Sequence, residues 1–154
     1  MYYAIVAALM FLLPMASIAT EAWVSAMPLG AQLVVKWFVF WSVGCRLLLA
    51  GMKQIYQPAY TAQKILGLKG DDSLILVREL GFANVAMGVL GVLSLFQQPW
   101  RLGAALAGGV FYGLAGINHA VQLHRNPLQH VAMSSDLFVS AMLLGASAML
   151  ALHI

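Results

Sequence analysis

The chain has 154 residues, of which 62% are hydrophobic and only 8% are charged, with a formal net charge of +3. A soluble domain carries about 25% charged residues, so this composition excludes an ordinary water-soluble globule and predicts a membrane protein. The length allows one domain. The positive charge does not form a basic run, which argues against nucleic acid as a partner.

Five apolar segments predict an all-α fold, a polytopic membrane helix bundle built as a single domain over residues 1–154. Each segment approaches or exceeds the roughly 20 residues that a helix needs to cross the hydrocarbon core. The first segment has an alternative reading as a cleaved signal, which would leave four spans, but it lacks the positive charge that signals carry before their apolar core. The predicted spans cover about 2–19, 29–51, 74–96, 102–122 and 131–152.

The distribution of Lys and Arg between the predicted loops sets the expected orientation. A cytoplasmic N-terminus places four basic residues on the cytoplasmic side and two on the other side. We therefore expect a cytoplasmic N-terminus and a C-terminus on the opposite side, which would be periplasmic in a bacterial inner membrane. The four cytoplasmic residues are Lys53, Lys64, Lys69 and Arg125, and the other two are Lys36 and Arg101.

Two loop features predict local structure. Asn126 followed by Pro127 is typical of an N-cap and first helical residue, which would open the last helix before its apolar part. In the long loop 52–73, Thr61 could cap a short interfacial helix over Ala62–Leu66. This loop could also fold back as a lid over a site, and the simpler interpretation is an interfacial loop anchored by its tyrosines. The candidate lid residues are Tyr56, Gln57, Tyr60 and Thr61.

Polar side chains inside the apolar segments form the candidate site, because charged groups are costly in lipid and by default mark function. Counted from the predicted span ends, the ionisable ones lie roughly 5–8 Å inside the cytoplasmic face. Their charges balance, so we expect ion pairs such as Asp136–Arg78 or Glu79–Arg46. A network that only fixes helix register is the alternative. The candidate residues are Arg46, Arg78, Glu79, Asn84, His119 and Asp136.

Small residues recur every third or fourth position on the third and fourth predicted spans, a pattern that lets helix backbones approach closely. Glu79 falls nearly opposite the glycine stripe of its helix, so we expect the third span to sit centrally, with helices on more than one side. The predicted packing residues are Gly81, Gly88, Gly91, Gly109, Gly113 and Gly116.

Other chemistry has little support in the sequence. His119 and His124 are five residues apart and fall on opposite faces of a helix, so no metal site is predicted. Cys45 is the single cysteine and cannot form an internal disulfide. No catalytic motif is present, which leaves enzyme activity open.

Several runs of sequence carry a resemblance to known proteins, over about residues 37–140. They are similar to a family of small bacterial inner-membrane proteins of unknown function, and more loosely resemble the DoxX-like four-helix membrane proteins. This resemblance implies a helical membrane fold without an established activity. Some DoxX-like proteins are associated with quinone-linked sulfur oxidation. The runs are WSVGCRLLLAG (41–51), QPAYTAQKILG (57–67), VRELGFANVAMGVLG (77–91), FYGLAGINHAVQ (111–122) and AMSSDLF (132–138).

The function we expect is the binding of a small amphiphile, such as a quinone as cofactor or a lipid, whose polar head meets the candidate residues. Arginines would hold an anionic or carbonyl oxygen. One alternative is a proton-coupled transporter with Glu79, His119 and Asp136 as a relay. Another is an accessory subunit that binds a membrane-protein partner, or a second copy, through the glycine stripes.

Overall fold

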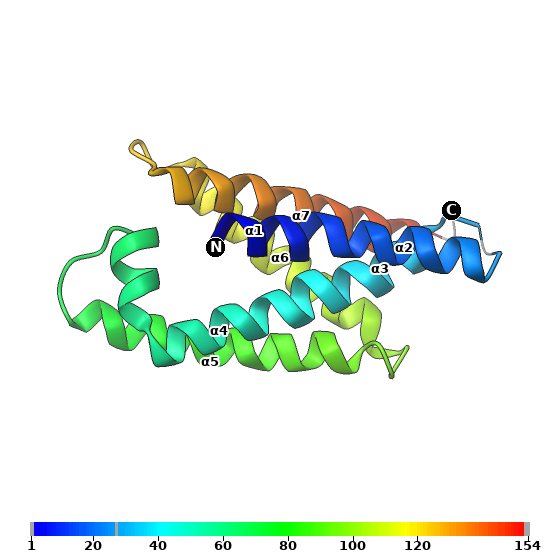
Figure 1. The fold of residues 1–154 in the computed structure, drawn as a ribbon, viewed down its shortest axis with the longest axis horizontal. Coiled ribbons are helices and arrows are strands. Elements are labelled where there is room, and N and C mark those ends of the chain that lie inside the picture. The colour runs from blue at the N-terminus through cyan, green and yellow to red at the C-terminus, as the bar shows by residue number, and fades with distance from the viewer. Residues whose placement is uncertain (1, 27, 153–154) are drawn as a thin grey trace.

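The computed structural model describes residues 2–26 and 28–152, and its regular structure in these ranges is entirely helical (Figure 1). Five long rods run along the molecule. Two of them contain π-helical turns, labelled η, between α-helical parts. The first rod comprises α1 (Tyr2–Ala7), η1 (Ala8–Leu12) and α2 (Leu13–Val24), and the second comprises α3 (Ala31–Phe38), η2 (Val39–Cys45) and α4 (Arg46–Tyr56). The short η3 (Tyr60–Ile65) precedes α5 (Asp72–Leu93), α6 (Trp100–Ala120) and α7 (Pro127–Ala151).

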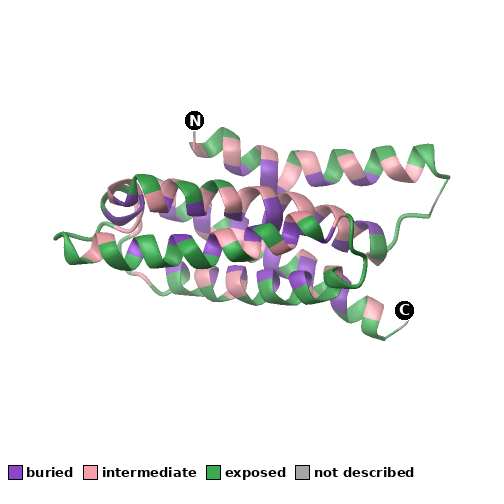
Figure 2. Cartoon of the chain, turned by 90° about the horizontal axis from the view of Figure 1, so that it is seen from below, coloured by how far each residue is buried: buried purple, intermediate pink, exposed green. Residues whose placement is uncertain are grey.

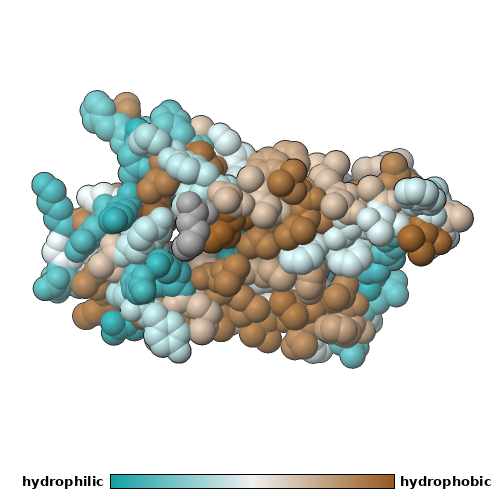
Figure 3. Space-filling view, in the orientation of Figure 1, coloured by the Kyte–Doolittle hydropathy of each residue, from teal (hydrophilic) through white to brown (hydrophobic). Residues whose placement is uncertain are grey.

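Four of the rods, excluding α6, are long and apolar enough to cross a membrane. Helix α6 has 21 residues but is less apolar, since it carries Arg101, Asn118 and His119. Hydrophobic residues cover the middle of the molecule, and hydrophilic residues gather at the end that contains η3 (Figure 3). Seen from below, exposed residues run along the outward sides of the helices (Figure 2). These features support the prediction of a multi-pass helical membrane protein.

The rods extend beyond the predicted spans, because helices continue into polar sequence where hydropathy falls. The second rod ends at Tyr56, not near Gly51. The last begins at Pro127, as the cap motif predicted. Asn126 Oδ1 accepts a hydrogen bond from the Gln129 amide at 2.9 Å, and Gln129 Oε1 accepts one from the Asn126 amide at 2.8 Å. This reciprocal capping box confirms the predicted start of the last helix.

The short interfacial helix differs from its prediction. It spans Tyr60–Ile65, earlier than the predicted Ala62–Leu66, and Thr61 lies within it. No side chain caps its start. Thr61 is the second residue of this helix, after the N-cap Ala59, so it does not stand at the capping position.

The second rod pairs with α5, and α6 pairs with α7, through contacts at glycine. A Cβ atom on Gly91 would lie 2.5 Å from the amide nitrogen of Gly44, and one on Gly51 would lie 2.6 Å from the carbonyl oxygen of Gly81. Such distances leave no room for a side chain, so the two backbones are in direct contact. In the second pair, a Cβ atom on Gly116 would lie 2.7 Å from Leu137.

The first two rods contact each other through α2 with α3 and through η1 with η2, and they separate toward α1 and α4. Figure 1 shows the start of α1 set back from the end of the bundle, with η3 at that end. Helix α5 lies at the edge and packs mainly on the second rod. The expectation of a central third span was therefore wrong. Glu79, opposite the glycine stripe, faces outward rather than toward a second neighbour.

The contact between Gly91 and Gly44 yields a test of the packing. We expect Gly91→Ala to lower the stability of the detergent-solubilised protein by about 1–3 kcal/mol, because the added methyl group must push two backbones apart. Gly103→Ala is the matched control, since a Cβ atom there meets nothing within 4 Å. Thermal unfolding followed by circular dichroism would check both. Equal midpoints for the two variants would contradict the packing.

Candidate functional site

Arg46 and Asp136 lie well inside their rods, measured from the end of the bundle that contains η3. Arg46 is ten residues before the last residue of α4, and Asp136 is nine residues after the first residue of α7. At 1.5 Å per residue these offsets put both side chains roughly 14–15 Å from that end of the bundle. The predicted depth of roughly 5–8 Å is counted from the ends of the apolar segments instead of the helix ends, so it stays a prediction of depth below the membrane face.

Four side chains meet at this depth, and we call them the Arg46 cluster: Tyr2, Arg46, Tyr112 and Asp136. The charges of Arg46 and Asp136 are within interaction range of each other and of both tyrosine hydroxyls. The guanidinium carbon of Arg46 lies 5.9 Å from the ring centroid of Tyr2. The Tyr112 hydroxyl donates to the carbonyl oxygen of Ser42, one turn before Arg46. Four different rods therefore contribute to one polar cluster.

The cluster contains an unused hydrogen-bond donor. Arg46 Nε is buried and has no partner among the described residues. Among the described residues, the one ion pair joins Lys36 to Glu21 at the opposite end of the bundle. The predicted pairs Asp136–Arg78 and Glu79–Arg46 therefore do not form. Arg46 and Asp136 do not form a direct salt bridge either.

Arg78 and Glu79 lie outside the cluster. Both are exposed on the outward face of α5, at the edge of the bundle. They do not approach Arg46 because α5 turns its glycine face, not this face, toward the second rod. The six predicted polar residues are thus divided between the interior and the outer surface.

Asn84 and His119 are both buried at separate places. Asn84 Nδ2 donates to Gln54 Oε1 at 2.7 Å and links α5 to α4, while its Oδ1 has no partner among the described residues. His119 lies in the last turn of α6, and its Nδ1 is also buried without a partner in the described chain. Of the residues predicted for the site, only Arg46 and Asp136 come together.

The loop predicted as a lid contains η3, which packs on α4 and α5. Thr61 is buried. Tyr56 and Gln57 are exposed at the end of α4. Asn126 Nδ2 donates to the carbonyl oxygens at the end of η3, those of Lys64 at 3.3 Å and Ile65 at 3.1 Å. One asparagine therefore caps α7 and holds η3.

A shallow groove of about 250 Å³ lies between Phe11 and the first part of α7, where His130 and Ser134 line it. The ring of Phe11 lines the groove and stacks on Phe138, with centroids 4.6 Å apart. The remaining lining residues are Val131 and Ser135.

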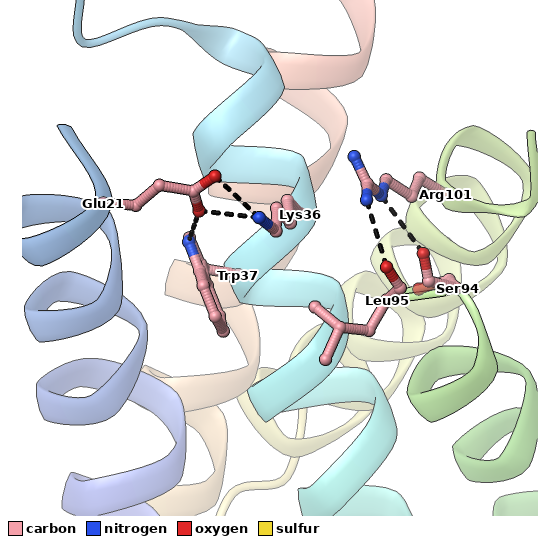
Figure 4. Close-up of polar contacts among 6 residues, drawn as sticks. All are labelled: Glu21, Lys36, Trp37, Ser94, Leu95 and Arg101. Carbon is pink, nitrogen blue, oxygen red and sulfur yellow. Dashed lines mark hydrogen bonds and ion pairs between the residues drawn. The ribbon is translucent and has the colours of Figure 1, made fainter. Parts of the chain in front are cut away.

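The opposite end of the bundle is held by a different set of contacts (Figure 4). Glu21 accepts hydrogen bonds from Lys36 Nζ at 2.7 Å and from Trp37 Nε1 at 2.6 Å, and so ties α2 to α3. Arg101 donates to the carbonyl oxygens of Ser94 at 3.1 Å and Leu95 at 3.2 Å. These bonds link α2 to α3 and link the start of α6 to the segment that follows α5. A hollow of about 370 Å³ at this end is lined in part by Gln32, Gln98 and Arg101.

The six predicted packing glycines all lie at close contacts inside the bundle. Gly81, Gly88 and Gly91 face the second rod, and Gly109, Gly113 and Gly116 face α7. At Gly113 the neighbour is the hydroxyl of Ser140, which donates to the Gly109 carbonyl oxygen at 2.8 Å. The glycine stripes are therefore occupied within one copy of the chain.

A model of the family described as a family of unknown function (DUF6790) matches residues 1–153. The chain belongs to this family. The match covers the whole of the bundle and agrees with the expected membership of an uncharacterised family. Among curated proteins and among solved structures, nothing matches the chain. The functional argument therefore rests on the site itself.

Three residues that the sequence analysis did not name as site residues make polar contacts with the named ones or with the cluster. Tyr112 shares the buried stripe of α6 with Gly109 and Gly116, which was its available signal. Tyr2 carried no signal in the sequence, since it stands at the start of an apolar segment. Gln54 was assigned to a loop, because the hydropathy pattern ended the second span before it.

The double role of Asn126 can be separated by substitution. Asn126→Asp keeps the oxygen that caps α7 but removes the amide donor to η3, so we expect the unfolding temperature to be retained while η3 is released. Trypsin should then cleave after Lys64 several-fold faster than in the unmodified protein. Asn118→Asp, at an exposed position of α6, is the control. Unchanged cleavage in Asn126→Asp would show that η3 is held by other contacts.

Proposed function

We propose that this protein is an integral membrane protein that binds a small amphiphile, with the polar head of the ligand between Arg46 and Asp136. The observation that carries the proposal is the buried Nε donor of Arg46, which has no partner in the described chain. An unpaired buried donor costs on the order of 1–3 kcal/mol, and more when it is charged. A ligand oxygen at this position would remove that cost.

The surroundings favour a head group with a carbonyl or anionic oxygen. Arginine offers several N–H donors in a fixed plane and binds such oxygens well. The tyrosine hydroxyls nearby, from Tyr2 and Tyr112, add polar groups at the same depth. The carboxyl group of Asp136 could accept a hydrogen bond from a ligand hydroxyl. A quinone and a lipid head group share this chemistry, namely acceptor oxygens on an apolar body.

The position in the bilayer explains why a ligand would be retained. A charged side chain near the centre of a membrane helix costs on the order of 2.5–3.5 kcal/mol on insertion scales. Arg46 and Asp136 offset part of this cost through their mutual attraction. The short helix η3 would cover the site from the end of the bundle.

The two alternatives receive less support. A proton relay through Glu79, His119 and Asp136 would need three neighbouring groups, whereas Glu79 is exposed on α5. An accessory subunit that uses its glycine stripes would need them free, whereas they contact helices of the same chain. Redox chemistry on a quinone would be a variant of the binding proposal.

The membrane placement is also part of the proposal. We propose five spans, with α6 as the fifth, a cytoplasmic N-terminus and a bacterial inner membrane as the location. The end that contains η3 carries Lys53, Lys64, Lys69 and Arg125, which favours the cytoplasmic side for it. The looser similarity to DoxX-like proteins remains a prediction.

Native mass spectrometry of the protein in mild detergent, with identification of any extracted molecule, tests the ligand. We expect a stoichiometric amphiphile on the unmodified protein and a loss of at least about tenfold in its occupancy in Arg46→Gln, because the charged donor is removed. Asp136→Asn tests the opposite side of the same space. Arg78→Gln is the matched control, since this arginine is exposed on α5.

Equal occupancy in Arg46→Gln and Arg78→Gln would contradict the proposed position of the ligand. The proposed function would be contradicted if the mass spectrum shows the protein without any bound molecule and the protein does not take up added ubiquinone analogues or phospholipid. Matching unfolding temperatures for the variants are required, so that loss of ligand is not loss of fold.

A further inference from the structure

The outward face of α5 carries two opposite charges that the bundle does not use. Arg78 and Glu79 are both exposed, and neither belongs to the one ion pair of the described residues. They stand among large apolar side chains that are also exposed. These apolar neighbours are Ile75, Leu76, Phe82, Val89 and Leu93.

The depth of Glu79 makes lipid a poor environment for it. Glu79 lies seven residues after the first residue of α5, which corresponds to roughly 10 Å along a helix 22 residues long. The long side chain of Arg78 can extend to the interface, but the shorter side chain of glutamate reaches less far. An ionised carboxylate at this depth therefore needs a cationic partner.

A second copy of the chain would supply that partner. We propose that the outward face of α5 is a parallel homodimer interface, in which Arg78 of each copy pairs with Glu79 of the other. A two-fold axis along the membrane normal puts identical residues of both copies at the same depth. One face with an adjacent cation and anion is then self-complementary, and two ion pairs form.

The other exposed helix faces do not offer this complementarity. The middle of α6 exposes Leu106, Val110 and Leu114, which suit a lipid environment. The glycine stripes, which are the other common basis for helix association, are already filled inside the bundle. The charges of α5 therefore select this face, and the inference does not depend on the ligand proposal.

Ala86 provides a position for measuring the contact. With 100° between successive residues, Ala86 falls between Arg78 and Glu79 around the axis of α5, and it is exposed. We expect Ala86→Cys, in a Cys45→Ser background, to form a disulfide-linked dimer in native membranes under mild oxidation. Ala107→Cys, on the exposed side of α6, is the matched control and should stay monomeric.

Charge reversal tests the pairing itself. Arg78→Glu alone places four carboxylates at the interface and Glu79→Arg alone places four guanidinium groups there, so each should weaken dimerisation in liposomes by at least about tenfold. When the two single variants are mixed with different fluorescent labels, both ion pairs are restored, so energy transfer between them should return. The double variant R78E/E79R should dimerise like the unmodified protein.

Three results would overturn the proposal. The first is Ala86→Cys cross-linking no more than Ala107→Cys. The second is dimerisation that both charge-reversed single variants retain, because the contact would then be apolar only. The third is mixing that fails to restore energy transfer while R78E/E79R also stays monomeric, at unchanged unfolding temperatures. Cross-linking of Ala86→Cys to a different membrane protein instead of a second copy would equally overturn it.

Discussion

The direct backbone contact between the second rod and α5 sets the arrangement of the bundle. At Gly44–Gly91 and Gly51–Gly81 no side chain separates the two helices. Because the hydrophobic effect gives little drive for association between helices in lipid, such van der Waals contact is the main available attraction. A second tight pair forms between α6 and α7. The first two rods then separate at one end, and a polar cluster lies where they separate.

Position in this arrangement decides what each charged residue can do. Arg46 is on the second rod, where its Nε is buried and its guanidinium lies near the ring of Tyr2. Arg78 and Glu79 are on the outer side of the tightly packed pair, because the glycine side of α5 is already in contact. The same sequence pattern, an ionisable residue in an apolar run, therefore marks an interior site in one place and a surface in the other.

The sequence predicted the helical membrane fold, the approximate positions of the helices and the cap at Asn126, since these depend on local composition and hydrogen bonding. It did not predict which ionisable residues meet. That outcome depends on helix length and rotation, since each residue turns a side chain by about 100° around the helix axis. It also did not predict the peripheral position of α5, because a glycine stripe says that a helix has a close neighbour but not how many neighbours it has.

Tyr2 and Gln54 show a second limit of sequence reasoning. Tyr2 lies at the start of a helix that is set back from the end of the bundle, so a residue that appeared terminal reaches the interior. Gln54 continues a helix beyond the apolar run and meets Asn84 across the glycine contact. Both interactions join segments far apart in the chain, and neither has a local signal.

The central claim is that the Nε donor of Arg46 binds an oxygen of a ligand. The chain has four arginines, Arg46, Arg78, Arg101 and Arg125, so arginine-selective ¹⁵N labelling gives few side-chain cross-peaks in an NMR spectrum, each assignable by substitution. The account predicts that the Nε–Hε cross-peak of Arg46 moves when bound amphiphile is removed by delipidation and returns when it is added back, while that of Arg78 stays. An Arg46 cross-peak that is the same with and without the amphiphile would contradict the account.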